Sequence, residues 1–351
     1  MITDKILIFF PNKPNINAGG PSGFIAQNLL DKDKSFYVFP FQLFSEKRLS
    51  TFLKMYLNKK SNKNINFSSF IFKEIKAYNY KYIFFHDCET FEYCKHLIRP
   101  NQTVILQSHS PELPSIEAQT SHRNSEEVIN LLKNAEKNSF ERADIIIFPH
   151  KDCVPLYESL NFDKSKIRYI LSGGKRNEEL RKYPLEKDKI NLLYIGRRNK
   201  IKGFDIVLES FKKVQKKRND INLIVVGAGE QIESDNIFDV GSTNTPHNWY
   251  YNADYVINAN RQSYFDLSVI EVLSTGTPLI LANNYGHNYY KDKSSGIITF
   301  DSNNAVELED IFLNKIIKNQ SKSIENINLY NEELSDFKYY ERFKLFFESL
   351  K

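Results

Sequence analysis

Cysteine is scarce in this 351-residue sequence: Cys88, Cys94 and Cys153 form an odd set without the paired spacing of a metal site. We interpret them as reduced thiols in a cytosolic compartment. Long apolar runs are also missing. The opening run Ile6–Phe10 is too short for a signal-peptide core, and no run approaches the roughly 20 residues that span a bilayer. We expect a cytoplasmic protein, soluble or peripheral on the inner face of the cell membrane.

Several chemical signatures are absent as well. No HxH, HExxH or DxD-like cluster in the sequence offers metal ligands, and there is no GxSxG motif. We therefore expect chemistry without a bound metal, without a resident cofactor and without a serine nucleophile of that type. The net charge of +5 is mild and the basic residues form no concentrated stripe. This pattern favours anionic ligands and argues against nucleic acid as a partner.

Short apolar runs rich in Ile, Val, Phe and Tyr alternate with longer amphipathic segments, which is typical of parallel strands that helices cover on both faces. The alternation predicts an α/β protein with two Rossmann-like parallel sheets. Expected strands of the first half are Lys5–Phe10, Ser35–Phe39, Tyr82–His86, Thr103–Gln107, Asp144–Phe148 and Ile167–Ile170. Those of the second half are Ile190–Ile195, Ile221–Val226, Asp254–Asn258, Pro278–Leu281 and Gly296–Phe300.

The segment Leu171–Leu185 breaks this rhythm and marks the domain junction. We expect an N-terminal acceptor domain over 1–172 and a C-terminal donor domain over 173–334. The tail 335–351 is charged, aromatic and amphipathic, and predicts a terminal helix. Helical periodicity also fills Phe204–Lys217 and Ser125–Ala143.

The first glycine cluster follows the first expected strand. Gly19 and Gly20 come just before a helix that begins near Pro21. Bare backbone amides at a helix N-terminus favour an anion such as a phosphate. An ordinary glycine-rich turn explains the same residues equally well.

A second motif, IGRRNKIKGF, opens the helix after the strand Ile190–Ile195. Arg197 and Lys202 lie five residues apart in it, beside Gly196. A guanidinium and an ammonium can neutralise two phosphates and the charge that develops on a departing diphosphate. The alternative is a pair of solvated surface cations. Gly227, in VVGAGE, ends the next strand and permits close approach of a ligand; a plain β-turn is the alternative.

The segment YFDLSVIEVLSTGTP predicts a loop that leads into a helix near Ser268. Backbone amides at Asp266, Leu267 and Ser268 could bind a phosphate or a sugar hydroxyl. Glu271 lies one turn into the helix among apolar neighbours, and its carboxylate could accept two ribose hydroxyl hydrogens. A surface glutamate on an amphipathic helix is the alternative, although a partly buried charge requires partners.

Two histidines follow strands of the first half. His109 and His86 could each orient a sugar hydroxyl or polarise an oxygen at a reaction centre. A structural role is the alternative for both. We interpret His150, His247 and His287 as structural.

The order of these motifs resembles the retaining glycosyltransferases of GT-B fold in family 4, the glycosyl transferases group 1. The resemblance is specific in Tyr194–Gly229 and Ala253–Ile280 and looser in the first half. It implies two Rossmann-like domains that face each other across a cleft, with the terminal helix packed back on the first domain.

The resemblance also implies roles for these residues. His109, Arg197 and Lys202 would be catalytic, with both cations on the diphosphate. Donor-binding residues would be Gly19, Gly20, Gly196, Gly227, Asp266, Leu267, Ser268 and Glu271.

One position departs from the family pattern. The family carries glutamates eight positions apart, and counting back from Glu271 leads to Ser263. The first glutamate normally faces the donor sugar, so Ser263 predicts a different sugar, with Asp266 as a substitute, or weakened catalysis. Ser263 and His86 are expected as contacts of the acceptor or the sugar.

The sequence thus predicts a hexosyltransferase-type enzyme that moves a sugar from a nucleoside-diphosphate sugar, with a UDP-sugar favoured, to a glycan or lipid-linked saccharide acceptor. The expected setting is bacterial surface polysaccharide or lipopolysaccharide assembly. A catalytically inactive subunit that binds a partner glycosyltransferase or a glycan is the alternative outside enzymes. A sugar-nucleotide epimerase is the alternative within them.

A basic, aromatic segment, Phe44–Lys63, offers a route to a lipid-linked acceptor. It could be an interfacial helix on anionic lipid. The alternative is a core-facing amphipathic helix followed by a solvated basic loop.

Overall fold

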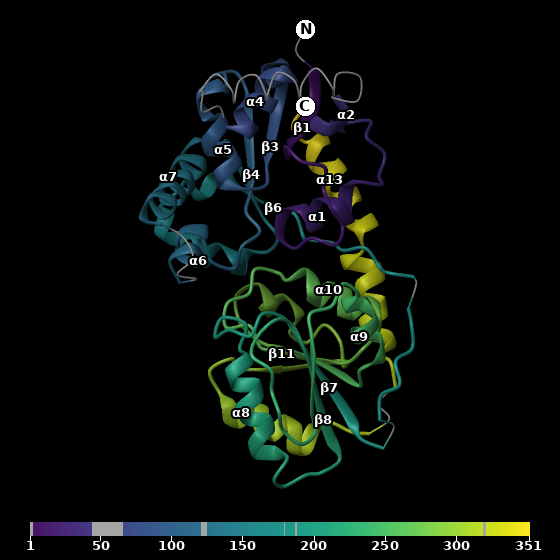
Figure 1. The fold of residues 1–351 in the computed structure, drawn as a ribbon. Helices are drawn as coiled ribbons and strands as arrows, with labels where there is room; N and C mark the ends of the chain where they lie inside the picture. The colour runs from purple at the N-terminus through teal and green to yellow at the C-terminus, as the bar shows by residue number, and fades with distance from the viewer. Residues whose placement is uncertain (1–2, 44–65, 121–124, 179, 187, 319–320) are drawn as a thin grey trace. The chain divides into compact units, whose positions relative to one another are not determined.

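The computed structural model describes residues 3–43, 66–120, 125–178, 180–186, 188–318 and 321–351. The chain forms two compact units. One comprises Met1–Ile170 with Tyr340–Lys351, and the other comprises Leu171–Tyr339. Each unit contains a six-stranded sheet with helices around it (Figure 1), and every strand pairing is parallel. The predicted α/β class with two parallel sheets is confirmed.

The first sheet has the strand order β2-β1-β3-β4-β5-β6. Its strands are β1 (Thr3–Phe9), β2 (Tyr37–Val38), β3 (Tyr80–Phe85), β4 (Thr103–Gln107), β5 (Ile145–Phe148) and β6 (Ile167–Tyr169). The α-helices of this unit are α1 (Gly20–Leu29), α2 (Pro40–Leu43), α4 (Phe67–Glu74), α5 (Cys88–Cys94), α6 (Pro114–Thr120) and α7 (Glu126–Arg142). Short 3-10 helices are η1 (Ala77–Asn79), η2 (Lys95–Leu97), η3 (Lys151–Leu160) and η4 (Lys164–Lys166).

Side chains of consecutive strand residues point to opposite faces of a sheet. Two neighbouring residues of β3 show that both faces of the first sheet are covered. Phe85 packs edge-on against Phe91 of α5, with ring centroids 5.5 Å apart. Its neighbour Phe84 packs against Phe343 of the last helix, α13 (Asp336–Glu348), at 5.7 Å. The continuous apolar runs of the sequence therefore correspond to strands that are buried on both sides.

Aromatic contacts fix the end of α13 on the first unit. Phe347 stacks on Phe36 with ring centroids 5.1 Å apart, and Tyr82 donates a hydrogen bond to the Leu350 carbonyl oxygen at 2.6 Å. Tyr340 donates to the Asp33 carbonyl oxygen at 3.1 Å. The amphipathic pattern of the tail thus produces a helix whose aromatic residues complete the core of this unit.

The second sheet has the order β12-β11-β10-β7-β8-β9. Its strands are β7 (Ile190–Ile195), β8 (Ile221–Val226), β9 (Ile237–Gly241), β10 (Tyr255–Asn258), β11 (Leu279–Ala282) and β12 (Ile297–Phe300). The helices are α8 (Phe204–Val214), α9 (Pro246–Asn252), α10 (Leu267–Ser274), η5 (Tyr285–Tyr290), α11 (Ala305–Asp310), η6 (Ile311–Lys315), α12 (Ile324–Leu329) and η7 (Tyr330–Leu334). Because β7 pairs with both β8 and β10, the carboxyl ends of these three strands lie at one edge of the sheet.

Some predicted elements differ from the observed ones. Only Tyr37–Val38 of the expected strand Ser35–Phe39 pairs, because Pro40 begins α2 directly afterwards. The helix expected over Phe204–Lys217 ends at Val214, whose carbonyl oxygen accepts the amides of Lys217 and Arg218 in a closing turn. Strand β9 was not predicted.

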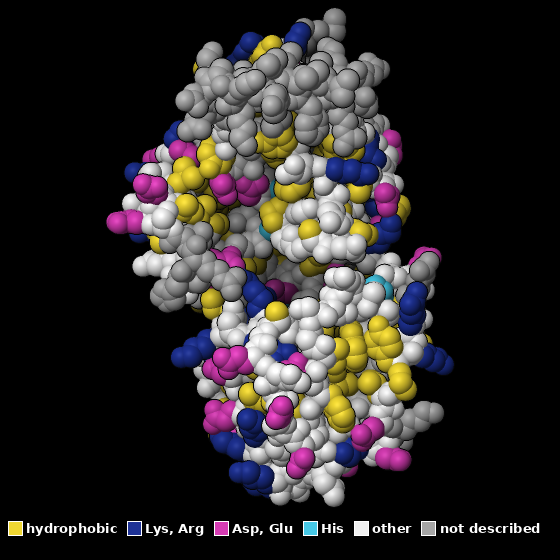
Figure 2. Space-filling model, in the orientation of Figure 1, with side chains coloured by type: hydrophobic (Ala, Val, Ile, Leu, Met, Phe, Trp, Pro, Cys, Tyr) yellow, Lys and Arg dark blue, Asp and Glu magenta, His cyan; other side chains and the backbone are white. Residues whose placement is uncertain are grey.

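On the face shown in Figure 2, cationic and anionic side chains are interspersed over both units. The basic segment 44–63 lies outside the described residues, so its expected role on a membrane stays a prediction. Among the residues that the structure covers, no helix combines the length and the apolar character needed to cross a bilayer.

Candidate functional site in the second unit

The loops after β7, β8 and β10 pack closely at the carboxyl edge of the second sheet. Gly227 has φ +143°, and a Cβ atom built there would lie 2.1 Å from the Gly196 carbonyl oxygen. Gly203 has φ +65°, and a Cβ atom there would lie 2.0 Å from the Ala259 carbonyl oxygen. Only glycine satisfies both the backbone angle and the contact at these positions. In open parallel sheets this edge is where ligands bind.

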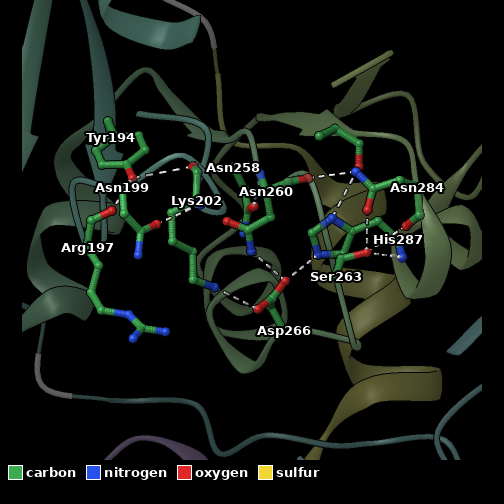
Figure 3. A network of polar contacts seen from close by, with 11 residues as sticks. Tyr194, Arg197, Asn199, Lys202, Asn258, Asn260, Ser263, Asp266, Asn284 and His287 are labelled. Atoms are coloured by element: carbon green, nitrogen blue, oxygen red, sulfur yellow. Dashed lines mark hydrogen bonds and ion pairs between the residues drawn. The ribbon is translucent and has the colours of Figure 1, made fainter. Parts of the chain in front are cut away.

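Three charged or ionisable side chains meet at this edge (Figure 3). The Lys202 ammonium Nζ lies 3.2 Å from Asp266 Oδ1. The other carboxylate oxygen, Oδ2, lies 2.8 Å from His287 Nε2 and accepts a 2.7 Å hydrogen bond from Asn260. Asp266 therefore connects a residue before α8, a residue after β10 and a residue of η5.

This environment determines the charge of Asp266. Burial alone would raise the pKa of its carboxyl, but the Lys202 ammonium, the His287 ring and the Asn260 amide lower it below its ordinary value. Asp266 is consequently ionised at neutral pH. Its side chain is 14% exposed and that of Lys202 is 21% exposed, so this pair reaches solvent. The His287 side chain is completely buried beneath them.

Ser263 lies at the position where the resembled family has its first glutamate, and it is fully buried. Its hydroxyl donates to the Asn284 carbonyl oxygen at 2.6 Å and accepts a hydrogen bond from the His287 backbone amide at 3.1 Å. Asn284 in turn donates to the Asn260 carbonyl oxygen at 2.6 Å. Ser263 therefore connects the loop before α10 to η5 and helps to place the His287 ring.

The backbone between Ser263 and α10 is unusual. Phe265 has φ +92°, a region that side chains larger than glycine rarely adopt. Its buried ring packs on Tyr289 and Tyr290, each at a centroid distance of 5.1 Å. This packing holds the strained residue and sets the position of Asp266, the N-cap of α10.

The two adjacent arginines of the β7–α8 loop have different environments. Arg197 is exposed, and its carbonyl oxygen accepts a 2.7 Å hydrogen bond from the Tyr194 hydroxyl. In Figure 3 its guanidinium extends separately from the Lys202–Asp266 contact. The Arg198 side chain is only 6% exposed, pairs with both carboxylate oxygens of Asp239, and donates to the Gly227 carbonyl oxygen at 2.8 Å. Arg198 therefore fixes the β8 loop.

Helix α10 carries the remaining predicted donor residues. Asp266, Leu267 and Ser268 form its N-terminal end, all half-buried, and Glu271 lies one turn later, also half-buried. Burial raises the pKa of the Tyr250 hydroxyl well above its ordinary value, and the negative charges of Glu271 and Asp266 add to this effect. Helix α10 and its loop thus carry two carboxylates that act on Tyr250, and one of them, Asp266, contacts Lys202.

The other predicted residues belong to the first unit. His86 Nδ1 and His109 Nε2 are 2.9 Å apart, and the two rings are stacked. Burial lowers the pKa of His109 to about 3. Burial, followed by the proximity of His109, lowers that of His86 well below its ordinary value. Both rings are therefore neutral at pH 7, and one donates to the other.

Gly19 and Gly20 are also in the first unit, at the start of α1. Gly20 has φ +61°, and no heavy atom of the described residues, apart from adjacent ones, lies within 4 Å of a Cβ atom built on Gly19 or on Gly20. The backbone at Gly19 is therefore open to a ligand. Within the described residues, no group of three or more His, Cys, Asp or Glu side chains is arranged to hold a metal ion.

Sequence reasoning missed two residues of this arrangement. His287 was interpreted as structural, yet its ring contacts Asp266 directly. Asn260 was not considered, although it donates to the same carboxylate. The position of both residues after a strand end was an available signal, since strand ends place polar side chains at the binding edge.

Known proteins resemble this chain in sequence and in fold. Residues 189–315 match the family model described as Glycosyl transferases group 1. A curated relative, "Uncharacterized 41.2 kDa protein in cps region" of Klebsiella pneumoniae, is 27% identical over 203 residues, covering 51% of this chain and 56% of that protein. The chain thus matches little more than half the length of this relative.

Solved structures resemble the whole chain at low identity. Sucrose-phosphate synthase from Thermosynechococcus elongatus has a TM-score of 0.67 and 15% identity, covering 98% of both chains. HepE from Anabaena in complex with UDP-glucose has a TM-score of 0.67 and 12% identity, covering 98% of this chain and 99% of that one. WaaG, a glycosyltransferase involved in lipopolysaccharide biosynthesis, has a TM-score of 0.57 and 11% identity, covering 81% of each. The chain therefore has the GT-B fold, and residues 189–315 of its second unit match the glycosyl transferases group 1 model.

Proposed function

We propose that the protein is a retaining glycosyltransferase that moves a sugar from a UDP-sugar to a glycan or lipid-linked acceptor without a metal ion. The observation that carries this proposal is the Lys202–Asp266–His287 cluster at the carboxyl edge of the second sheet. All three residues lie within 189–315, the part that matches the group 1 model. HepE structures with UDP-glucose and with UDP support the choice of uridine nucleotide.

The proposed chemistry depends on charge rather than on a protein nucleophile. The Lys202 ammonium, assisted by the exposed Arg197, would stabilise the negative charge that develops on the departing diphosphate. Glu271 would accept the ribose hydroxyl hydrogens, and the backbone around Asp266–Ser268 would contact the phosphate or the sugar. The glycines at 196 and 227 let the backbone of the strand ends approach the donor.

His109 enters this proposal as a neutral ring. Its lowered pKa suits a hydrogen-bond partner of a sugar hydroxyl and does not suit a general acid at pH 7. Three residues of the first unit stay predictions: Gly19 and Gly20 as contacts of the donor, and His86 as a contact of the sugar or the acceptor. We place the donor site on the second unit, since the charged residues gather there.

The proposed acceptor and setting come from similar proteins. The Klebsiella relative is described as lying in a cps region, and WaaG is described as acting in lipopolysaccharide biosynthesis. We infer assembly of a bacterial surface polysaccharide, on the cytoplasmic side of the cell membrane. Liposome sedimentation at low salt tests membrane contact, and anionic vesicles that fail to retain the protein contradict it.

The donor is tested by thermal unfolding of the protein with UDP, GDP, ADP, CMP and dTDP and with their common sugar conjugates, without added metal. A ligand that binds only the folded state raises the melting temperature. We expect uridine nucleotides to raise it. Absence of a shift with every nucleotide would contradict the proposed function.

A catalytically inactive subunit is a second candidate, favoured by Ser263. This residue stands where the resembled family has a glutamate. It is fully buried, and its hydroxyl donates a hydrogen bond to the carbonyl oxygen of Asn284 in another loop. A solved GtfA/B complex has a TM-score of 0.52 and 13% identity to this chain, covering 76% of it. The two candidates are separated by combining nucleotide binding with a search for a stable partner complex. Tight partner binding with no nucleotide binding would support the inactive subunit.

A further inference from the structure

Both ring nitrogens of His287 face oxygen atoms. Nε2 lies 2.8 Å from Asp266 Oδ2, and Nδ1 lies 3.2 Å from the Ala282 carbonyl oxygen at the end of β11. A backbone carbonyl oxygen and an ionised carboxylate only accept hydrogen bonds. A proton on each nitrogen makes both contacts favourable, which describes an imidazolium ion; the Nε2–Asp266 contact is then an ion pair by its distance, without the alignment of a regular hydrogen bond.

We propose that His287 is a buried imidazolium that positions and neutralises Asp266, so that Lys202 can bind the diphosphate of the donor. This inference rests on the proposed function and concerns the same site. In this proposal His287 does not contact the donor. It acts through Asp266 as a positioning residue.

The contact distances support this division of roles. Asp266 Oδ2 is held by His287 at 2.8 Å and by Asn260 at 2.7 Å, whereas Lys202 approaches Oδ1 at 3.2 Å. The carboxylate thus has two shorter contacts, with His287 and Asn260, and one longer contact, with Lys202. An ammonium carries three donors on a flexible stem, so Lys202 can turn towards a phosphate while Asp266 stays bound.

The charge balance supports it as well. With a neutral His287, the Lys202–Asp266 pair has no net charge, and a phosphate that engages Lys202 would leave a carboxylate without a cation beside a second anion. With an imidazolium, the three residues carry one net positive charge. Like charges that lack a counter-charge repel strongly in a partly buried site, so the imidazolium favours the bound diphosphate.

Apart from Asp266, the described neighbours that contact His287 are uncharged. The Tyr290 ring lies 6.1 Å away, edge-on, and the Ser263 hydroxyl contacts the His287 backbone amide. On the other side of Asp266, the Lys202 ammonium lowers the pKa of this carboxyl. The negative charges of Asp266 and Glu271 both raise the pKa of Tyr250. Asp266 is therefore the anion in direct contact with the imidazole ring.

The first test is a measurement of the His287 ring nitrogens by ¹⁵N NMR in the unliganded protein at pH 7, with the signals assigned through the side-chain bonds. We expect both nitrogens to show the signature of attached protons. A signal from an unprotonated ring nitrogen would overturn the inference. This readout needs no substitution and no ligand, so it stands even if the protein binds no nucleotide.

The second test is calorimetric titration of UDP into the protein and into His287→Gln. The ion pair with Asp266 is lost, so we expect UDP binding to weaken about tenfold or more. His247→Gln is the matched control: that histidine is bonded to Asn177 at 3.1 Å, and we expect unchanged affinity. If His287→Gln binds UDP as tightly as the unmodified protein, the inference is wrong.

A double-variant comparison separates positioning from general destabilisation. In an Asp266→Asn background, His287→Gln should weaken UDP binding no further, because the carboxylate through which it acts is gone. An equal loss in both backgrounds would overturn the positioning role. If the unmodified protein binds no UDP, the proposed function fails, and the ¹⁵N signature alone then decides whether His287 is an imidazolium.

Discussion

Ser263 donates a hydrogen bond to the Asn284 carbonyl oxygen across 2.6 Å, from a fully buried position in the loop before α10. The same hydroxyl accepts the backbone amide of His287 at 3.1 Å. The residue that replaces the family glutamate is thus part of the framework that places His287 under Asp266.

The first prediction concerns Ser263. Ser263→Ala removes a buried hydroxyl that donates to the Asn284 carbonyl oxygen and accepts from the His287 amide, so we expect the free energy of unfolding to fall by about 1 kcal/mol; the His287 amide keeps its second acceptor, the Asn284 carbonyl oxygen at 2.9 Å. Ser263→Glu places a carboxylate in the same buried position and should lower the melting temperature further. Thermal unfolding of both variants checks this. A glutamate variant that is as stable as the unmodified protein and transfers sugar faster would contradict the structural role of Ser263.

The second prediction concerns Lys202. Lys202→Ala removes the ammonium that faces the diphosphate, and we expect kcat/KM for sugar transfer to fall about 100-fold. Arg197→Ala should have a smaller effect, and the double variant should abolish transfer while the protein stays folded. Lys200→Ala, an exposed lysine of the same loop, is the control and should transfer normally. Unchanged turnover in the double variant would show that neither cation belongs to the catalytic site.

The third prediction separates Arg198 from Arg197. Arg198→Ala leaves the Asp239 carboxylate buried without its cation, and we expect a loss of about 3 kcal/mol in the free energy of unfolding. Arg197→Ala removes an exposed side chain and should change stability by less than about 0.5 kcal/mol. Urea unfolding of the two neighbouring variants measures the difference. Equal stabilities would show that the buried ion pair has no net value.

The fourth prediction concerns pH. Burial lowers the pKa of His109 to about 3, whereas an unfolded histidine titrates near about 6.5. Between these values the unfolded chain binds a proton that the folded protein does not. Stability is therefore complete above about pH 6.5 and is lost as the pH falls towards 3, by about 1.4 kcal/mol per pH unit for this residue.

Urea unfolding at pH 7, 6 and 5 measures this slope. His109→Gln should flatten it, because the variant lacks the ring whose pKa burial lowers. The same lowered pKa predicts that His109 contributes no ionisation to the pH–rate profile between pH 5 and 8. A slope that is identical in the His109 variant would contradict the lowered pKa of His109.

The fold could largely be predicted from the sequence, because buried parallel strands leave continuous apolar runs that short-range patterns reveal. Thr103–Gln107 and Ile190–Ile195 were predicted with the observed bounds. Strand β9 was missed since Ile237–Gly241 is an edge strand whose Phe238 and Val240 are exposed. One buried face and one open face in five residues give too weak a signal.

The site could be predicted only in part. Glycines and the two cations of the β7–α8 loop mark the binding edge by their position after a strand. The sequence does not distinguish Arg197 from Arg198, since burial of the second arises from Asp239, 41 residues further on. His287 is 21 residues from Asp266 in the chain, and their contact depends on how η5 folds back over the loop before α10.

The most direct test of the donor site is a crystal structure of the protein with UDP. We predict the diphosphate within hydrogen-bond distance of Lys202 Nζ, the ribose hydroxyls on the Glu271 carboxylate, and Asp266 still in contact with His287. UDP bound elsewhere, or bound here with the Lys202–Asp266 contact intact and the diphosphate away from Lys202, would contradict the proposed site.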